Sequence, residues 1–195
     1  MRQEPSKELI QNAFSQFSNF PDEVWEFCKD NWQKLTYSKG EVLLEAGSIE
    51  KYLTVVQSGI QRIVYRTSEG AELTLGFSFA PSFSGAYDSL LYQRPSIYSL
   101  EALSDSVVWG ITYKDLMNLF DHFQSMDRWG REFAQQILIG RGKREIELLT
   151  MTAAQRFHAF AERSPKELFD IPQKYLASYL NMTPETFSRI RAERT

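Results

Sequence analysis

The first part of the chain carries apolar residues at helical spacing. The positions are Leu9, Ile10, Phe14 and Phe17, followed by Val24, Trp25, Phe27, Cys28 and Trp32. Steps of three and four residues place such side chains on one face of a helix. The pattern is interrupted at Phe20-Pro21-Asp22, and proline suits the first turn of a helix. We therefore predict two short helices within residues 5–36, the second beginning at or near Pro21.

Residues 37–113 change to short apolar or alternating segments. The segments are 42–44, 52–56, 61–65, 73–77, 98–102 and 106–111, with Gly40, Gly47, Gly59 and Gly70 close to their ends. Strand-length segments at near-regular spacing, separated by turn residues, are typical of an all-β roll or barrel. This part of the chain is predicted to form an antiparallel β-roll.

The helical period returns in residues 114–150, which contain no proline. Alternating steps of three and four residues form an a/d seam of Phe123, Met126, Gly130, Phe133, Ile137 and Gly140. One interpretation is a helix that packs only on its own roll. We favour a dimer helix, because the segment is long for one small domain and its two seam glycines would let a second helix approach closely.

After Met151 the pattern indicates three compact segments. Residues 153–162 are predicted to be helical up to Ser164-Pro165, and two further helices, 172–180 and 183–194, are separated by a turn of only two residues. In the first helix of this pair, Leu176, Ala177 and Leu180 share one face, and Ala177 is small enough for close helix crossing. Asn181 stands where a left-handed backbone is needed, a conformation that Asn tolerates well. The pair is predicted to be a helix-turn-helix.

The second helix of the pair has a clear start. Thr183 is a good N-cap, Pro184 suits the first helical position, and Glu185 lies in the first turn. Phe187 and Ile190 are three residues apart and are predicted to face inward. The residues then left facing outward are Pro184, Glu185, Ser188, Arg189 and Arg191.

These outward positions have chemistry suited to DNA. Arginine can donate two hydrogen bonds to guanine and glutamate can accept one from cytosine, so Glu185 and Arg189 are predicted to contact base edges. The predicted phosphate contacts are Thr183, Ser188, Lys174 and Arg194. The alternative is a plain helical hairpin in which Glu185 and Arg189 form only an i,i+4 surface ion pair.

The composition and charge of the chain are compatible with DNA binding by its C-terminal part. The 195 residues are 43% hydrophobic and 24% charged, which excludes a wholly disordered chain. The net charge is −3, but residues 151–195 hold 7 Lys and Arg against 5 Asp and Glu, whereas residues 1–150 hold 15 against 20. A mildly basic C-terminal part is compatible with DNA binding there. No apolar run is long enough for a membrane helix and the first residues lack the apolar core of a signal peptide, so a cytoplasmic protein is expected.

The sequence argues against a metal site, a disulfide or an iron–sulfur cluster. The single cysteine, Cys28, excludes an intramolecular disulfide and a cysteine-built cluster, and is expected to be a buried thiol. Metal-dependent enzymes with β-roll folds need clustered histidines, whereas His122 and His158 both lie on predicted helices outside the roll. We expect no metal and no enzymatic activity.

Several stretches resemble the Crp/Fnr superfamily (cyclic-AMP receptor protein and fumarate-nitrate reductase regulator). Residues 172–191 resemble its helix-turn-helix, and residues 39–47, 52–59 and 70–77 are similar to its cyclic-nucleotide-binding-type β-roll. The resemblance spans residues 37–194. It implies an α+β protein with a sensor β-roll and N-terminal helices in 1–120, a dimerisation helix in 121–150 and an all-α helix-turn-helix domain in 151–195. Members usually continue into a small β wing, whereas this sequence ends at Thr195, which indicates either a wingless variant or a truncated chain. Contacts from a wing are therefore not expected.

The resemblance also implies a function. It predicts a homodimeric transcription regulator that reads a palindromic site in double-stranded DNA, with Glu185 and Arg189 matching the base-reading positions and RNA polymerase as a further candidate partner. The alternative is a small-molecule-binding or protein-interaction module whose helix-turn-helix does not bind DNA productively, which the weak basic charge would favour.

The effector region departs from the family pattern. Members that bind cyclic AMP carry Phe-x-Gly-Glu, then Arg-Ser or Arg-Thr before the next strand. Here Ala86 takes the glutamate position, Ser96 takes the arginine position, and Arg94 is two residues early. The candidate effector residues are Ser84, Gly85, Ala86, Arg94, Ser96 and Ile97. Because charge-assisted hydrogen bonds would be lost, the region is expected to bind a small molecule other than cyclic AMP, or none.

Overall fold

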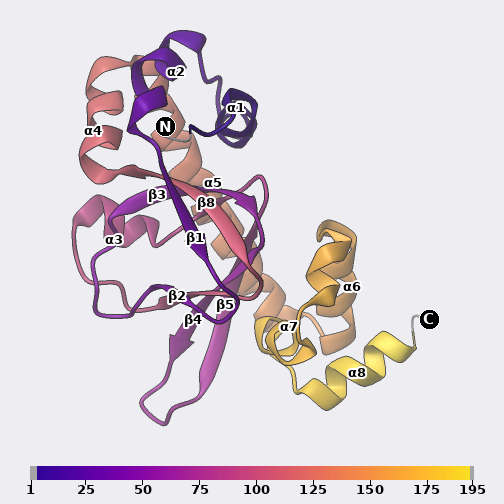
Figure 1. Cartoon of the computed structure of the whole chain (residues 1–195). Coiled ribbons are helices and arrows are strands. Elements are labelled where there is room, and N and C mark those ends of the chain that lie inside the picture. Colours follow the sequence, from indigo (N-terminus) through magenta and orange to yellow (C-terminus); the bar gives the residue numbers. More distant parts are fainter. Residues whose placement is uncertain (1–3, 194–195) are drawn as a thin grey trace. The chain divides into compact units, whose positions relative to one another are not determined.

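A computed structural model describes residues 4–193, except for the side chain of Glu167. The chain divides into two compact units (Figure 1). Unit 1 comprises residues 1–63 and 77–136, and unit 2 comprises residues 64–76 and 137–195.

Unit 1 begins with the two predicted helices. α1 (Lys7–Ser15) starts at Ser6, whose hydroxyl accepts a hydrogen bond from the N–H of Leu9, and α2 (Asp22–Cys28) starts directly after Pro21. A short 3₁₀ turn, η1 (Lys29–Asn31), leads into the first strand. The Cys28 thiol is buried, as expected, and burial raises its pKa to about 11.

The predicted β-roll is confirmed as two antiparallel sheets of four strands each (Figure 1). In the first sheet the order is β1 (Gln33–Tyr37), β8 (Ser106–Thr112), β3 (Tyr52–Ser58) and β6 (Phe83–Ser84). In the second it is β2 (Val42–Leu44), β7 (Ser99–Ala102), β4 (Ile60–Arg66) and β5 (Glu72–Phe79). A short helix, α3 (Tyr87–Tyr92), follows β6. The roll begins at Gln33, a few residues before the predicted start.

The tight turn between β3 and β4 depends on Gly59. Its φ of +90° is unfavourable for residues with a side chain, and a Cβ there would lie 2.2 Å from the hydroxyl of Ser106. Any other residue would therefore displace the start of β8.

Two helices follow the roll, α4 (Tyr113–His122) and α5 (Gln124–Thr150). The first part of α5 packs within unit 1. Met126 and Trp129 are fully buried, the Trp129 ring stacks on Phe133 at 4.9 Å, and its indole N–H donates to the carbonyl of Phe14. The ring of Phe120 lies 3.2 Å from where a Cβ of Gly130 would be.

This packing corrects the interpretation of the a/d seam. Met126 and Phe133 are buried within their own chain, so the prediction that these two residues face a second copy is wrong. The large apolar residues that remain exposed lie further along: Leu138 (72% exposed), Ile139 (48%), Ile146 (61%) and Leu149 (79%). Periodicity identified the helix but not which face its own domain covers.

Unit 2 contains the end of α5, the tip of the β4–β5 hairpin and the C-terminal helices. The helices are α6 (Ala153–Arg163), α7 (Gln173–Tyr179) and α8 (Pro184–Ala192), with a 3₁₀ segment, η2 (Lys166–Asp170), after α6. α6 starts with a capping box between Thr152 and Gln155. Phe157, Leu176 and Phe187 are buried where α6, α7 and α8 meet, with the Phe157 and Phe187 rings edge to face at 5.4 Å.

Candidate functional site

The turn between α7 and α8 has the predicted geometry. Leu176 and Ala177 are fully buried and Leu180 nearly so, and Asn181 adopts a left-handed backbone with φ of 50°. The N–H of Met182 donates to the carbonyl of Ala177 across this turn. The predicted packing face and turn residue are therefore both confirmed.

The start of α8 is also as predicted. The hydroxyl of Thr183 accepts a hydrogen bond of 3.2 Å from the N–H of Thr186, and Pro184 occupies the first turn. Phe187 is fully buried and Ile190 is 5% exposed. Burial of these two side chains fixes the opposite face of α8 toward solvent.

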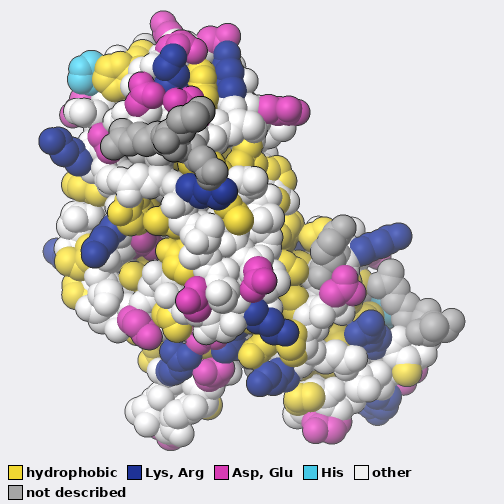
Figure 2. Space-filling model, viewed as in Figure 1, with side chains coloured by type: hydrophobic (Ala, Val, Ile, Leu, Met, Phe, Trp, Pro, Cys, Tyr) yellow, Lys and Arg dark blue, Asp and Glu magenta, His cyan; other side chains and the backbone are white. Residues whose placement is uncertain are grey.

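That opposite face presents the predicted DNA-contact residues. Thr183, Pro184, Glu185, Ser188 and Arg189 are exposed on α8, and Arg191 is half-buried. Lys174 is exposed on α7, its ammonium 4.9 Å from the centre of the Tyr175 ring. Arg194 lies outside the described residues. Figure 2 shows basic side chains over the surface formed by α6–α8, with acidic and apolar ones between them.

Glu185 is bound to the helix start rather than to Arg189. Its own backbone N–H and the hydroxyl of Thr183 hold the pKa of the Glu185 carboxyl below its usual value. In the described residues no ion pair joins Glu185 to Arg189, so the surface-pair alternative receives no support. Both functional groups remain accessible to a ligand.

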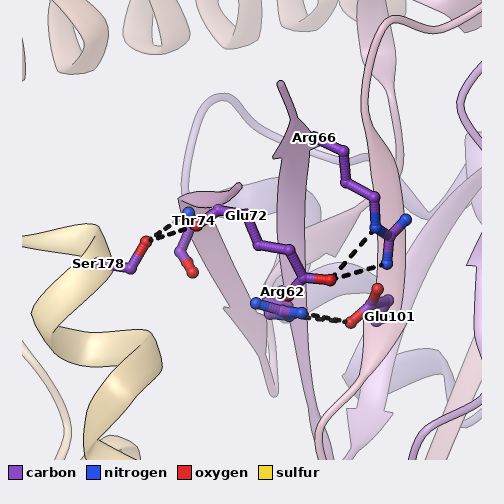
Figure 3. A network of polar contacts seen from close by, with 6 residues as sticks. All are labelled: Arg62, Arg66, Glu72, Thr74, Glu101 and Ser178. Carbon is purple, nitrogen blue, oxygen red and sulfur yellow. Dashed lines mark hydrogen bonds and ion pairs between the residues drawn. The ribbon is translucent and has the colours of Figure 1, made fainter. Parts of the chain in front are cut away.

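Ser178, on α7, makes a contact that the sequence analysis does not single out. Its hydroxyl accepts a hydrogen bond of 2.9 Å from the N–H of Thr74 and donates one of 3.4 Å to the carbonyl of Glu72, both in the β4–β5 hairpin (Figure 3). The partners are more than 100 residues away in the sequence. No local pattern could have indicated this contact.

The candidate effector residues are split between the interior and the surface of unit 1. Ser84, Ala86 and Ser96 are buried, whereas Arg94 and Ile97 are exposed, Ile97 by 71%. Gly85 has φ of +125°, and a Cβ there would lie 3.3 Å from a carboxylate oxygen of Glu50. The residues therefore do not all line one common surface.

The buried part of this region is occupied by the chain's own side chains. Ala86 and Tyr98 pack with Leu44 and Leu100 in one apolar cluster, and the hydroxyl of Tyr98 donates to Asp88. The Ser96 hydroxyl donates to the carbonyl of Tyr98 at 2.7 Å. Ser96, at the family's arginine position, thus completes a local turn.

Glu50 is a buried carboxylate that the sequence analysis does not identify. One oxygen accepts hydrogen bonds from the N–H groups of Lys51 and Tyr52, and the other accepts one of 3.2 Å from the N–H of Ala86. Burial raises the pKa of Glu50, and these N–H donors offset part of the rise. The N–H of Ala86, a candidate effector residue, is therefore bonded to an acidic side chain of the same chain.

Other parts of the described chain offer no metal site. Among residues 4–193, no group of three or more His, Cys, Asp or Glu side chains is placed to hold a metal ion. His122 and His158 are both exposed. None of the described helices combines the length and apolar character that a membrane span requires.

Comparison with known proteins gives a matching family model for part of the chain and a shared fold for most of it. Residues 34–123 match the family of the cyclic nucleotide-binding domain. No curated protein sequence matches the chain.

Solved structures resemble most of the chain. FixK2 from Bradyrhizobium japonicum is 18% identical over 83% of each chain, with a TM-score of 0.71. The c-di-GMP-responsive global regulator CLP from Xanthomonas campestris is 17% identical over 89% of this chain and 91% of its own, with a TM-score of 0.68. A structure described as a Crp/Fnr-family transcriptional regulator, from Eubacterium rectale, is 15% identical over 89% and 83%, with a TM-score of 0.67.

These matches confirm the resemblance inferred from the sequence. Residues 34–123 match the cyclic nucleotide-binding domain, and the chain has the α+β fold seen in the Crp/Fnr-type regulators.

Proposed function

We propose that this protein is a DNA-binding transcription regulator of the Crp/Fnr type that acts as a homodimer. The observation that carries the proposal is the exposed face of α8. Burial of Phe187 and Ile190 leaves Glu185 and Arg189 accessible on a helix of nine residues. A helix of this kind fits the major groove, where side chains can meet base edges.

The residues divide into two kinds of contact. Arg189 is suited to guanine and Glu185 to cytosine, and these contacts would carry sequence specificity. Thr183, Ser188 and Lys174 would contact phosphates, with Arg191 at the edge of the same surface, and these contacts would fix the position of the helix on the duplex. The fold's likeness to known regulators supports this assignment.

A second copy would place two such helices on one site. The exposed residues Leu138, Ile139, Ile146 and Leu149 fall within a sector of about 100° around α5, at 100° per residue. An apolar stripe of this size on a helix is typical of an interface. Twofold symmetry would then set two α8 helices roughly 34–36 Å apart on a palindrome.

Regulation through the roll is proposed to differ from the cyclic-AMP pattern. Ala86 and Ser96 stand where members that bind cyclic AMP carry a glutamate and an arginine. The Tyr98 side chain packs against Ala86, and the Glu50 carboxylate accepts the hydrogen bond of the Ala86 N–H. We therefore propose an effector other than cyclic AMP, or none. Calorimetry with cyclic AMP and cyclic GMP tests this, and micromolar binding of either would overturn it.

DNA binding itself is tested by selection and titration. The purified protein is used to select sequences from a randomised duplex pool, and the selected duplex is titrated by fluorescence anisotropy at several salt concentrations. We expect a palindromic sequence and an affinity that falls steeply as salt rises. Binding that selects no sequence and depends weakly on salt would instead favour the ligand-binding or protein-interaction module.

A further inference from the structure

Three consecutive carbonyl groups at the end of α7 each accept a hydrogen bond from an arginine. Arg144, on α5, donates from Nη2 to the carbonyl of Tyr179. Arg156, on α6, donates from Nε to Leu180 at 2.8 Å and from Nη2 to Asn181 at 3.0 Å. The last carbonyls of a helix have no partners within the helix, so these arginines supply them.

Arg156 also reaches a fourth carbonyl, on another element. Its Nη1 donates to Met151, just beyond the end of α5, at 2.6 Å. A single guanidinium thus joins the end of α5, its own helix α6 and the turn before α8. Only a planar group with several diverging N–H donors can do this.

The position of these bonds matters because the turn is short. Asn181 is the left-handed residue of the turn, and Thr183, two residues later, is already the N-cap of α8. A change in the backbone at Leu180 and Asn181 would therefore alter the direction in which α8 leaves the turn. Glu185 and Arg189 would move with it.

We infer that Arg156 is a positioning residue for sequence recognition: it holds the turn so that α8 presents Glu185 and Arg189 in one fixed orientation. The inference rests on the proposed DNA-binding function. The proposed role of Arg156 requires no contact between Arg156 and DNA. Loss of the Arg156 guanidinium should therefore lower the affinity for the selected DNA sequence more than the affinity for DNA of unrelated sequence.

The substitution Arg156→Lys separates these two effects. Lysine keeps the positive charge, but its single ammonium cannot reproduce the fork that reaches three carbonyls. The matched control is Arg163→Lys on the same helix. Arg163 also joins α6 to α5, through an ion pair with Glu147, and on α7 it meets the side chain of Tyr179. Its described hydrogen bonds do not include the carbonyls of Leu180 and Asn181, which Arg156 holds.

The measurement is the ratio of affinities for the duplex selected by the wild-type protein and for a scrambled duplex of equal length. We expect Arg156→Lys to lower this ratio at least fivefold while its affinity for the scrambled duplex stays within twofold. Arg163→Lys should leave both values within twofold. Hydrogen exchange should rise in residues 178–186 of Arg156→Lys and stay unchanged in α6.

Each other outcome contradicts a particular claim. An unchanged ratio in a folded Arg156→Lys protein overturns the positioning role. If Arg156→Lys and a second variant, Arg156→Gln, both lose the wild-type helical circular-dichroism signal, the inference is also overturned, because Arg156 is then required for the fold itself. If the wild-type protein selects no sequence, the proposed function fails first.

Discussion

The hydroxyl of Ser178 on α7 and the main-chain N–H of Thr74 on β5 are joined by a hydrogen bond of 2.9 Å (Figure 3). β5 is an edge strand of its sheet, so this N–H has no partner strand on that side. The Ser178 hydroxyl takes the place of a partner strand: it accepts the hydrogen bond of the Thr74 N–H and donates one to the carbonyl of Glu72. A single side chain thereby attaches the hairpin tip to the C-terminal helices within unit 2.

Replacing Ser178 with alanine should destabilise unit 2. The N–H of Thr74 and the carbonyl of Glu72 would lose their partner, and the expected loss of unfolding free energy is about 1 kcal/mol. Urea denaturation measures it. Ser188→Ala, an exposed serine on α8, is the matched control and should change the unfolding free energy by less than about 0.5 kcal/mol. Equal effects of the two variants would contradict the contact.

Loss of a buried ion pair should lower the free energy of unfolding far more than loss of an exposed one. The guanidinium of Arg62 is 3% exposed and bonds Glu101 on β7 at 2.8 and 2.9 Å (Figure 3). Glu101→Gln would leave a buried cation without its carboxylate, and we expect a loss of about 3 kcal/mol in unfolding free energy.

The exposed pair Arg66–Glu72 is the control for that experiment. Its side chains are 44% and 39% exposed and the ions are 3.2 Å apart. Glu72→Gln should cost about 0–1 kcal/mol, because solvent screens the pair. Calorimetric melting of both variants checks the difference, and a Glu101→Gln protein as stable as Glu72→Gln would show that burial does not govern the pair.

Arg189→Ala should relax sequence discrimination at one base pair of each half-site. The expected loss is about 1–3 kcal/mol at that position, with little change at the others. Lys174→Ala is the comparison, because a lost phosphate contact weakens binding to all sequences alike and lowers the salt dependence. Anisotropy titrations with single-base variants of the selected duplex distinguish them. Uniform weakening by Arg189→Ala would identify Arg189 as a phosphate contact.

Glu50 should give the stability of the roll a particular pH dependence. Because burial raises its pKa, the folded protein keeps this proton at pH values where the unfolded chain, with a pKa of about 4.3, has released it. Its contribution to the unfolding free energy therefore falls as pH rises from about 4.3 through the raised pKa. Between about pH 4 and 7, the wild-type protein should lose stability relative to Glu50→Gln.

Urea denaturation at a series of pH values measures that difference. Glu45→Gln, which removes an exposed carboxyl from the same loop, is the control for the change in net charge. A wild-type protein that gains stability over Glu50→Gln as pH rises would show that the N–H donors, rather than burial, dominate at this carboxylate.

Sequence reasoning succeeded where the signal is local. The left-handed Asn181, the Thr183 cap and the inward Phe187 were all predicted, because each follows from the residue type and its immediate neighbours. Six strands of the roll were recognised for the same reason, whereas β1 and the two-residue β6 were not. Base-contact and dimer assignments remain predictions.

What sequence reasoning missed depends on contacts between distant segments. The bonds of Arg156 to Leu180 and of Ser178 to Thr74 join residues 24 and 104 positions apart. The seam of α5 was misjudged because Met126 and Phe133 have the same spacing whether their own domain or a partner covers them. Periodicity identifies an apolar face, but only the tertiary structure shows what covers it.

The bonds of Ser178 to the hairpin end on peptide groups rather than on side chains. Every residue type except proline supplies the same N–H, and all supply the same carbonyl. Evolution could therefore exchange the residues at positions 72 and 74 without a compensating change at position 178. A comparison of related genes that searches for correlated substitutions would leave this attachment undetected.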